Sequence, residues 1–99
     1  MIIVHISAEA GHDMEAIGDY IARDDPTRAL SFVQELRTKC LELADLPEGF
    51  PLVPRYESDG IRRRAHGNYL IFYRFKAGSL TVIHVLHGRR DYEPILSSS

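Results

Sequence analysis

The chain has 99 residues, of which 44% are hydrophobic and 26% charged, a composition that is typical of one globular domain over residues 1–99 and excludes wholesale disorder. It has no apolar run of the ~20 residues that span a bilayer, no signal-like leader and a single cysteine, so we expect a cytoplasmic protein without membrane segment or internal disulfide. Residues 1–54 carry 4 Lys/Arg against 10 Asp/Glu, whereas residues 55–99 carry 8 against 4, so the basic second half predicts an anionic partner, either nucleic acid or an acidic protein.

The first predicted elements are a short strand and two helices. Residues 2–6 are mostly β-branched and predict a strand. Ser7 is a suitable N-cap for a helix that runs from residue 8 to about residue 23, with its apolar side chains on one face. Asp25 and Pro26 are typical first residues of a second helix, which should run to about Asp45 and form a helical hairpin with the first.

The rest of the chain predicts a loop and then three strands. Prolines and glycines recur between residues 46 and 60 and predict a loop. Residues 61–66, 69–76 and 79–87 predict strands, because two-residue turns rich in Gly and Asn separate them. The middle strand has four consecutive apolar residues and should be covered on both faces. The order is therefore β-α-α-β-β-β, an α+β fold with a helical hairpin packed on a small, mainly antiparallel sheet.

This order, with particular residues, resembles the RelE/ParE superfamily of bacterial toxins, and its ParE branch most closely. The resemblance covers residues 2 to about 96. It is carried by Ser-Ala-Glu-Ala at 7–10, Tyr-Ile at 20–21, Gly-Ile-Arg-Arg at 60–63, Gly-Asn-Tyr-Leu-Ile-Phe-Tyr-Arg at 67–74 and His-Gly-Arg-Arg-Asp-Tyr at 87–92.

The resemblance implies the toxin of a type II toxin–antitoxin module of the kind that stabilises plasmids and arrests growth. A separately encoded antitoxin, ParD-like or similar, would neutralise it in a toxin–antitoxin hetero-oligomer. ParE-like members are associated with inhibition of DNA gyrase, and hence of DNA replication, without catalysis of their own. RelE-like members are instead endoribonucleases that cleave messenger RNA on the ribosome, and this remains the alternative. The resemblance implies no cofactor.

Cleavage of RNA would require a general base, cations at the phosphate and a general acid. His84, His87, Arg64 and Tyr92 are the candidates for these roles. His84 and His87 are an odd number of residues apart on one strand, so they should point to opposite faces, and His84 is better explained as a hydrogen-bonded core histidine. RelE-type enzymes also carry a denser set of lysine, arginine and histidine. We therefore favour the ParE-like interpretation.

Two sets of site residues follow from this interpretation. The basic residues after the last strand should contact gyrase, together with the aromatic residue that follows them, and the predicted set is His87, Arg89, Arg90 and Tyr92. The antitoxin should fill a groove between the helical hairpin and the sheet with apolar anchors and acidic residues, and the predicted contacts are Ile17, Tyr20, Arg62, Arg64, Tyr69, Tyr73 and Arg74. At least one of the three arginines at 62–64 should instead be structural, paired with a helix carboxylate or a loop carbonyl.

Other function classes receive little support. The five histidines show no metal-ligand spacing, and no glycine-rich phosphate loop occurs. Sequence-specific binding to a DNA duplex is not expected, because the helices are acidic and phosphates would repel them. A purely structural interaction domain without toxicity remains compatible with the same pattern.

Overall fold

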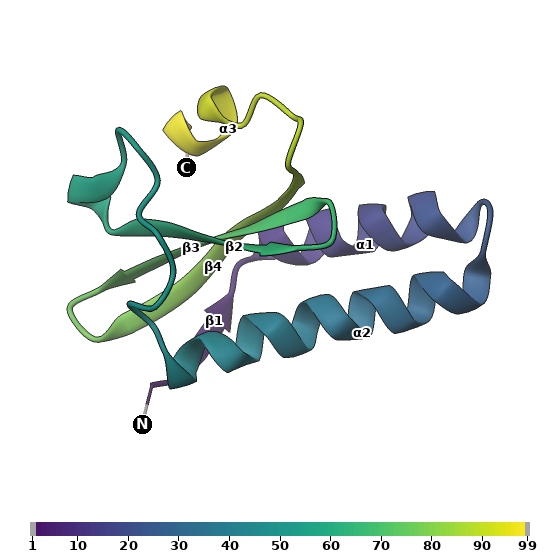
Figure 1. Ribbon diagram of the computed structural model, residues 1–99, viewed down its shortest axis with the longest axis horizontal. Helices are drawn as coiled ribbons and strands as arrows, with labels where there is room; N and C mark the ends of the chain where they lie inside the picture. Colours follow the sequence, from purple (N-terminus) through teal and green to yellow (C-terminus); the bar gives the residue numbers. More distant parts are fainter. Residues whose placement is uncertain (1, 99) are drawn as a thin grey trace.

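Two long helices and four strands make up most of the residues that the structure describes, residues 2–98 (Figure 1). This computed structural model contains, in chain order, β1 (Val4–Ile6), α1 (Ala8–Ala22), α2 (Pro26–Glu42), the 3-10 turns η1 (Leu43–Asp45) and η2 (Glu57–Asp59), β2 (Ile61–His66), β3 (Tyr69–Lys76), β4 (Ser79–His87) and α3 (Glu93–Ser97). The predicted β-α-α-β-β-β order is confirmed, with α3 and η2 as additional short elements.

Side chains of the residues before each long helix determine where it begins. The Ser7 hydroxyl oxygen accepts the Ala10 N–H at 3.0 Å, and the same hydroxyl donates to the Ile83 carbonyl, which ties the start of α1 to β4. The Asp25 carboxylate accepts the Arg28 N–H at 3.0 Å ahead of Pro26. The second helix ends at Glu42, three residues before the predicted end at Asp45. Residues 43–45 instead form the 3-10 turn η1 ahead of Pro47.

The strands form one sheet in the order β1-β4-β3-β2. The pairs β2–β3 and β3–β4 are antiparallel hairpins, and only β1 runs parallel to its neighbour, with Val4 opposite Leu80. The register shifts between Phe72 and Tyr73, so that Ile83 is an extra residue in β4. The sheet is therefore mainly antiparallel, as predicted.

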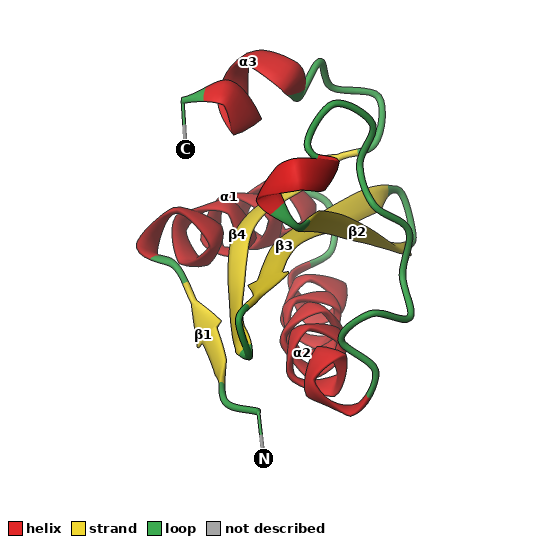
Figure 2. Cartoon of the chain, turned by 90° about the vertical axis from the view of Figure 1, so that its left-hand side faces the viewer, coloured by secondary structure: helices red, strands yellow, loops and turns green. Residues whose placement is uncertain are grey.

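Both faces of the sheet are buried (Figure 2). The helical hairpin covers one face, and the larger core cluster between them includes Met14, Leu36 and Val82. On the other face, α3 and the loop before β2 cover Phe72, and Leu96 from α3 is almost fully buried there. The prediction that the middle strand is covered on both faces is confirmed, since three consecutive residues of β3, Ile71–Tyr73, have no exposed surface.

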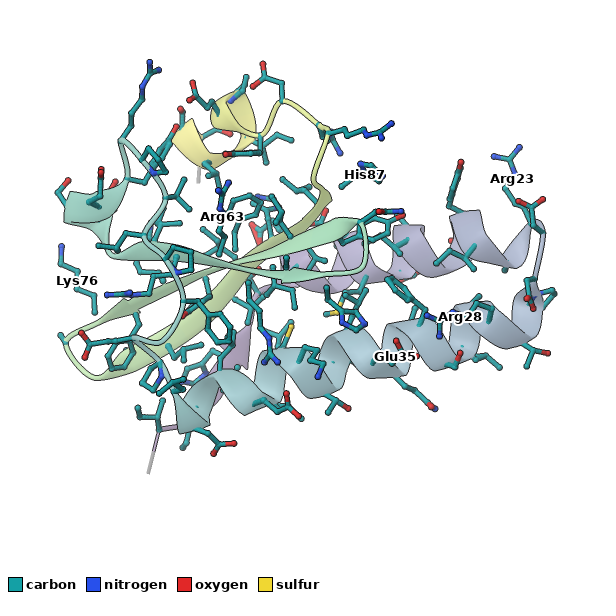
Figure 3. The ribbon with its side chains drawn as sticks, viewed as in Figure 1. Arg23, Arg28, Glu35, Arg63, Lys76 and His87 are labelled. Carbon is teal, nitrogen blue, oxygen red and sulfur yellow. The ribbon has the colours of Figure 1, made fainter. Side chains whose placement is uncertain are left out.

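The helical hairpin extends beyond the sheet at the end where the β2–β3 turn lies, so the last turns of α1 and the first turns of α2 project past the strands (Figure 1). Arg23 lies at the tip of this projection (Figure 3). None of the helices within residues 2–98 has the length and apolar character that would be needed to cross a bilayer.

Candidate functional site

An open groove lies where the hairpin extends past the sheet. A hollow of about 700 Å³ is bordered by α1, by α2, by the β2–β3 turn and by the end of β4. A smaller hollow of about 180 Å³ adjoins it and shares three side chains with it, those of Tyr20, Tyr69 and His87. We call the two hollows together the tyrosine groove, and its lining also includes Ile17, Ile21, Arg28, Phe32 and Arg90.

Aromatic rings form the wall of the tyrosine groove. Phe32 on α2 stacks on His66 at a centroid distance of 5.4 Å and lies 5.6 Å from the ring of Tyr69. The Tyr69 ring meets that of His87 edge to face at 5.3 Å. Tyr20 stands opposite with 64% of its surface exposed. Burial, with a smaller contribution from Tyr20, raises the pKa of Tyr69, so its hydroxyl is protonated at neutral pH. The groove thus presents a rigid, largely apolar aromatic surface to solvent.

Cations lie at both ends of this surface. Arg28 lies over the Phe32 ring at 5.1 Å and pairs with Glu35, its neighbour along α2 in Figure 3. The hydrogen bond from Arg28 has the largest effect on Glu35 and lowers its pKa, and a hydrogen bond from His66 lowers it further. Glu35 in turn raises the pKa of Arg28 through the same hydrogen bond. Arg90 lies at the other end, beside His87. Arg90 has no side-chain partner within residues 2–98, so an acidic residue of an apolar segment in the groove would complement this end.

Three of the predicted antitoxin contacts line the groove, namely Ile17, Tyr20 and Tyr69. Tyr73 does not, because β3 is a central strand and its side chain is fully buried, with the hydroxyl donating to the Pro47 carbonyl at 2.8 Å. This interior position raises the pKa of Tyr73 through burial. Tyr73 shares the helix-facing core with Tyr69, as their spacing predicts, but it contributes packing rather than a contact surface.

The three consecutive arginines of β2 all bind groups within the fold. Arg64 donates to the Lys39 carbonyl at 3.0 Å and to the Glu42 carboxylate at 3.1 Å, and so closes the end of α2 onto the sheet. Arg62 donates to the Phe50 carbonyl at 2.7 Å. On the other face of the strand, Arg63 donates to the Tyr92 hydroxyl at 3.1 Å, between the sheet and α3 (Figure 3). The prediction that at least one of the three is structural is confirmed.

Other cations of the second half also have partners. Arg74 and Lys76 donate to the carbonyls of Asp59 and Ser58, respectively, and so hold the 3-10 turn η2 against β3. Arg55 pairs with Glu93 at 3.3 Å, next to the start of α3. Much of the positive charge after residue 54 is therefore paired with carbonyl and carboxylate groups of the same chain.

Arg89 and Arg90 differ from these cations. Within residues 2–98, neither side chain has a hydrogen-bond or ion-pair partner, and residues 88–91 are exposed. Their backbone is nevertheless ordered, since the Arg89 N–H donates to His87 Nδ1 at 3.1 Å and the Arg90 N–H to the His87 carbonyl at 3.0 Å. The Tyr92 ring packs 4.8 Å from that of Phe72 and anchors the far end. We call residues 87–92 the basic tail.

The four candidate catalytic residues lie in separate environments. His84 donates from Nδ1 to Asp13 on α1 at 2.8 Å, as expected of a hydrogen-bonded histidine, and it lines a different hollow from that of His87. Arg64 is bound to the end of α2, and Tyr92 packs under α3. The Nδ1 lone pair of His87 is already taken by a backbone N–H. Within residues 2–98, the structure therefore does not bring these four predicted side chains together at one site.

Several residues of the site have no clear signal in the sequence. Asp13 occupies an ordinary acidic position of an amphipathic helix, yet its carboxylate also accepts the Val85 N–H of β4 at 3.0 Å. Phe32 is an apolar residue of α2 with only 7% of its surface exposed, yet it forms part of the groove lining. Arg28 and Glu35 lie two turns apart on α2, but His66 is far from them in sequence, and only the packing of α2 on β2 brings it to Glu35.

Comparisons with known proteins agree with this architecture. A family model described as the ParE toxin of the type II toxin–antitoxin system parDE matches residues 4–92. Among solved structures, a chain of the chromosomal ParDE TA system from P. aeruginosa matches with a TM-score of 0.73, at 20% sequence identity, over 88% of this chain and 96% of that chain. At this identity the structural match shows a shared fold. No curated protein matches the chain.

Proposed function

Because the chain belongs to the ParE toxin family of type II toxin–antitoxin systems, we propose that it is a toxin that inhibits DNA gyrase, and thus replication, through its basic tail. In the same proposal, a cognate antitoxin neutralises it by binding in the tyrosine groove. The toxin and its antitoxin are cytoplasmic, and the toxin needs no catalytic chemistry of its own.

The free charge of the basic tail is the observation that supports a target site there. The second half of the chain has eight lysines and arginines, and six of them pair with other groups of the chain, Arg55 at the surface; within residues 2–98, Arg89 and Arg90 are the two of the eight whose side chains have no such partner. The segment is held at His87 and at Tyr92, so little conformational entropy would be lost when a partner binds it. An anionic surface of the gyrase–DNA complex would fit these two guanidinium groups.

A gyrase assay tests this site directly. We expect the purified chain, freed of antitoxin, to block supercoiling of a plasmid by gyrase and ATP, and the double variant Arg89→Glu/Arg90→Glu to lose this inhibition while it keeps its far-UV circular dichroism spectrum. Arg55→Glu is the matched control, because it reverses an exposed charge of the same half and breaks only a surface ion pair, worth about 0–1 kcal/mol. Undiminished inhibition by the folded double variant would contradict the proposal.

The alternative RelE-like activity is tested in parallel on translating ribosomes with a defined message. Message cleavage with gyrase unaffected would overturn the gyrase proposal and would return attention to His84, His87, Arg64 and Tyr92. We expect an intact message, because these four side chains lie in separate environments.

The tyrosine groove supports the antitoxin part of the proposal. Its exposed aromatic walls offer large contact areas, and Arg28 and Arg90 lie at its ends. Aromatic side chains of this kind carry much of the binding energy in many interfaces, so Tyr20→Ala should weaken antitoxin binding by roughly 2 kcal/mol. Leu46→Ala is the control, since Leu46 is also exposed but lies outside the groove. A hydrogen-exchange map in which the antitoxin protects neither the hairpin tip nor β3 would count against this site.

A further inference from the structure

The outer face of the helical hairpin, on the side away from the tyrosine groove, is apolar and uncovered. A hollow of about 480 Å³ runs between α1 and α2 there, and small side chains form much of its lining. Leu30 and Leu41 of α2 are 71% and 58% exposed. The residues of this outer hairpin face are Gly11, Glu15, Gly18, Asp19 and Ala22 of α1, and Leu30, Val33, Arg37 and Leu41 of α2.

The two helices contribute opposite kinds of side chain to this face. On α2, Leu30, Arg37 and Leu41 are seven and four residues apart and form one stripe of large apolar groups with a cation at its centre. On α1, Gly11, Gly18 and Ala22 are likewise seven and four residues apart, and they leave a shallow stripe of small residues. The large side chains on α2 of one molecule can therefore pack against the small residues on α1 of another.

Helix contact determines which positions lie level with each other. A Cβ at Gly18 would be 3.0 Å from Cγ2 of Val33, so these two residues lie side by side. Counting in opposite directions from this pair along the antiparallel helices places Leu30 within one residue of the level of Ala22, and Leu41 within one residue of the level of Gly11. Each leucine therefore has a small residue of the other helix beside it.

The charges on the two helices of this face are also opposite in sign. Glu15 and Asp19 lie on α1, and Arg37 lies on α2. Within residues 2–98, none of the three has a hydrogen-bond or ion-pair partner for its side chain. Arg37 thus joins Arg89 and Arg90 as a cation with no such partner, but it lies on the opposite side of the molecule from a target site at the basic tail.

We propose that a second copy of this chain covers the outer hairpin face. A two-fold axis parallel to the helices would set α1 of each copy on α2 of the other, with Leu30 over Gly18 and Ala22 and Arg37 beside Glu15 and Asp19. One chain supplies both complementary halves, which an isologous dimer requires. Two helices about 10 Å wide and roughly 22 Å long offer on the order of 440 Å² per partner, below the ~800 Å² of standard interfaces, so we expect a weak dimer.

The dimer leaves the tyrosine groove open. Tyr20 is two residues from both Gly18 and Ala22, roughly 200° around α1, so it points away from the outer face. Self-association can therefore occur with or without a partner in the groove, and it does not depend on the proposed function.

Sedimentation equilibrium of the purified chain, from about 1 μM to 500 μM, tests the proposal. We expect a monomer–dimer equilibrium, and a dissociation constant that Leu30→Glu raises at least about tenfold, because the substitution places a charge in the apolar contact twice per dimer. Leu46→Glu is the matched control, since it adds the same charge at an exposed leucine outside the face and should leave the equilibrium unchanged. A monomer at all concentrations, or equal effects of the two substitutions, would overturn the proposal.

A charge exchange identifies the geometry and does not depend on the apolar variant being folded. Arg37→Glu should weaken the dimer about tenfold, and Glu15→Arg with Asp19→Arg in the same chain should restore it. Failure of the triple variant to recover would refute the arrangement. If Leu30→Glu instead loosens only the complex with antitoxin while the toxin alone stays monomeric, the face belongs to the antitoxin and the dimer is excluded.

Discussion

Beyond Val82, β4 no longer pairs with β1, and Asp13 of α1 binds His84 and Val85 there instead. This contact allows a direct test of the role of His84. The Asp13 carboxylate accepts two hydrogen bonds, from His84 Nδ1 at 2.8 Å and from the Val85 N–H at 3.0 Å. The two side chains are only 22% and 13% exposed, for Asp13 and His84 respectively. We expect His84→Ala to lower the free energy of unfolding by about 1.5–2 kcal/mol, the value of one hydrogen bond to a charged group.

Asp13→Ala should cost more than His84→Ala. It removes both bonds and leaves the Val85 N–H without a partner on a partly covered strand edge, so we expect a loss of about 3–5 kcal/mol. In the double variant the two losses should not add, and the coupling should be about 1–2 kcal/mol. Asp13→Asn keeps an acceptor for Val85 and should fall between the two single variants.

Urea unfolding at neutral pH, followed by far-UV circular dichroism, measures these differences. A stable His84→Ala variant, unchanged within about 0.5 kcal/mol, would refute the structural role of this histidine. If the same variant also lost toxicity, His84 would have to act on the target instead. A loss of toxicity in step with stability would mean only that less folded toxin is present.

Two further predictions concern the core and a turn. Burial raises the pKa of the Cys40 thiol from 9.0 to about 11, so the folded state favours the protonated form. The stability present below pH 9 should therefore fall by roughly 2 kcal/mol as the pH rises to 11, relative to a Cys40→Ala variant titrated in parallel, and equal alkaline slopes would contradict this. Gly60 has φ +72°, and a Cβ there would be 2.9 Å from the Phe75 carbonyl oxygen, so Gly60→Ala should cost about 2 kcal/mol more than Gly78→Ala, which has a similar φ but open space around it; equal costs by chemical denaturation would show that the turn can adjust.

Strong local signals made most of the fold predictable. The strands β2, β3 and β4 have the predicted bounds, because Gly67 and Gly78 occupy positive-φ turn positions that few other residues accept. The helix starts at Ser7 and Asp25 were predictable for a similar reason, since each cap needs only a side chain three residues before a free N–H.

Polar contacts between distant elements were less predictable. The spacing of Arg62, Arg63 and Arg64 shows which of them share a face, but their partners come from α2, from the loop after it and from Tyr92. The helix α3 has five residues, too few for a helical period to be recognised, and its value to the fold rests mainly on one buried leucine, Leu96. These features depend on tertiary placement rather than on local propensity.

The parallel pairing of β1 with β4 has a consequence for synthesis on the ribosome. Val4 and Leu80 are partners in the sheet, so the strand made first cannot be paired until the strand made last has been translated. A nascent chain that lacks residues 79–87 has no neighbour for β1 and only two strands against its helical hairpin. Pairings so far apart in sequence form late in folding. A chain that ends before residue 79 should therefore lack a complete sheet, and we expect the fold to form only after the last strand has been translated.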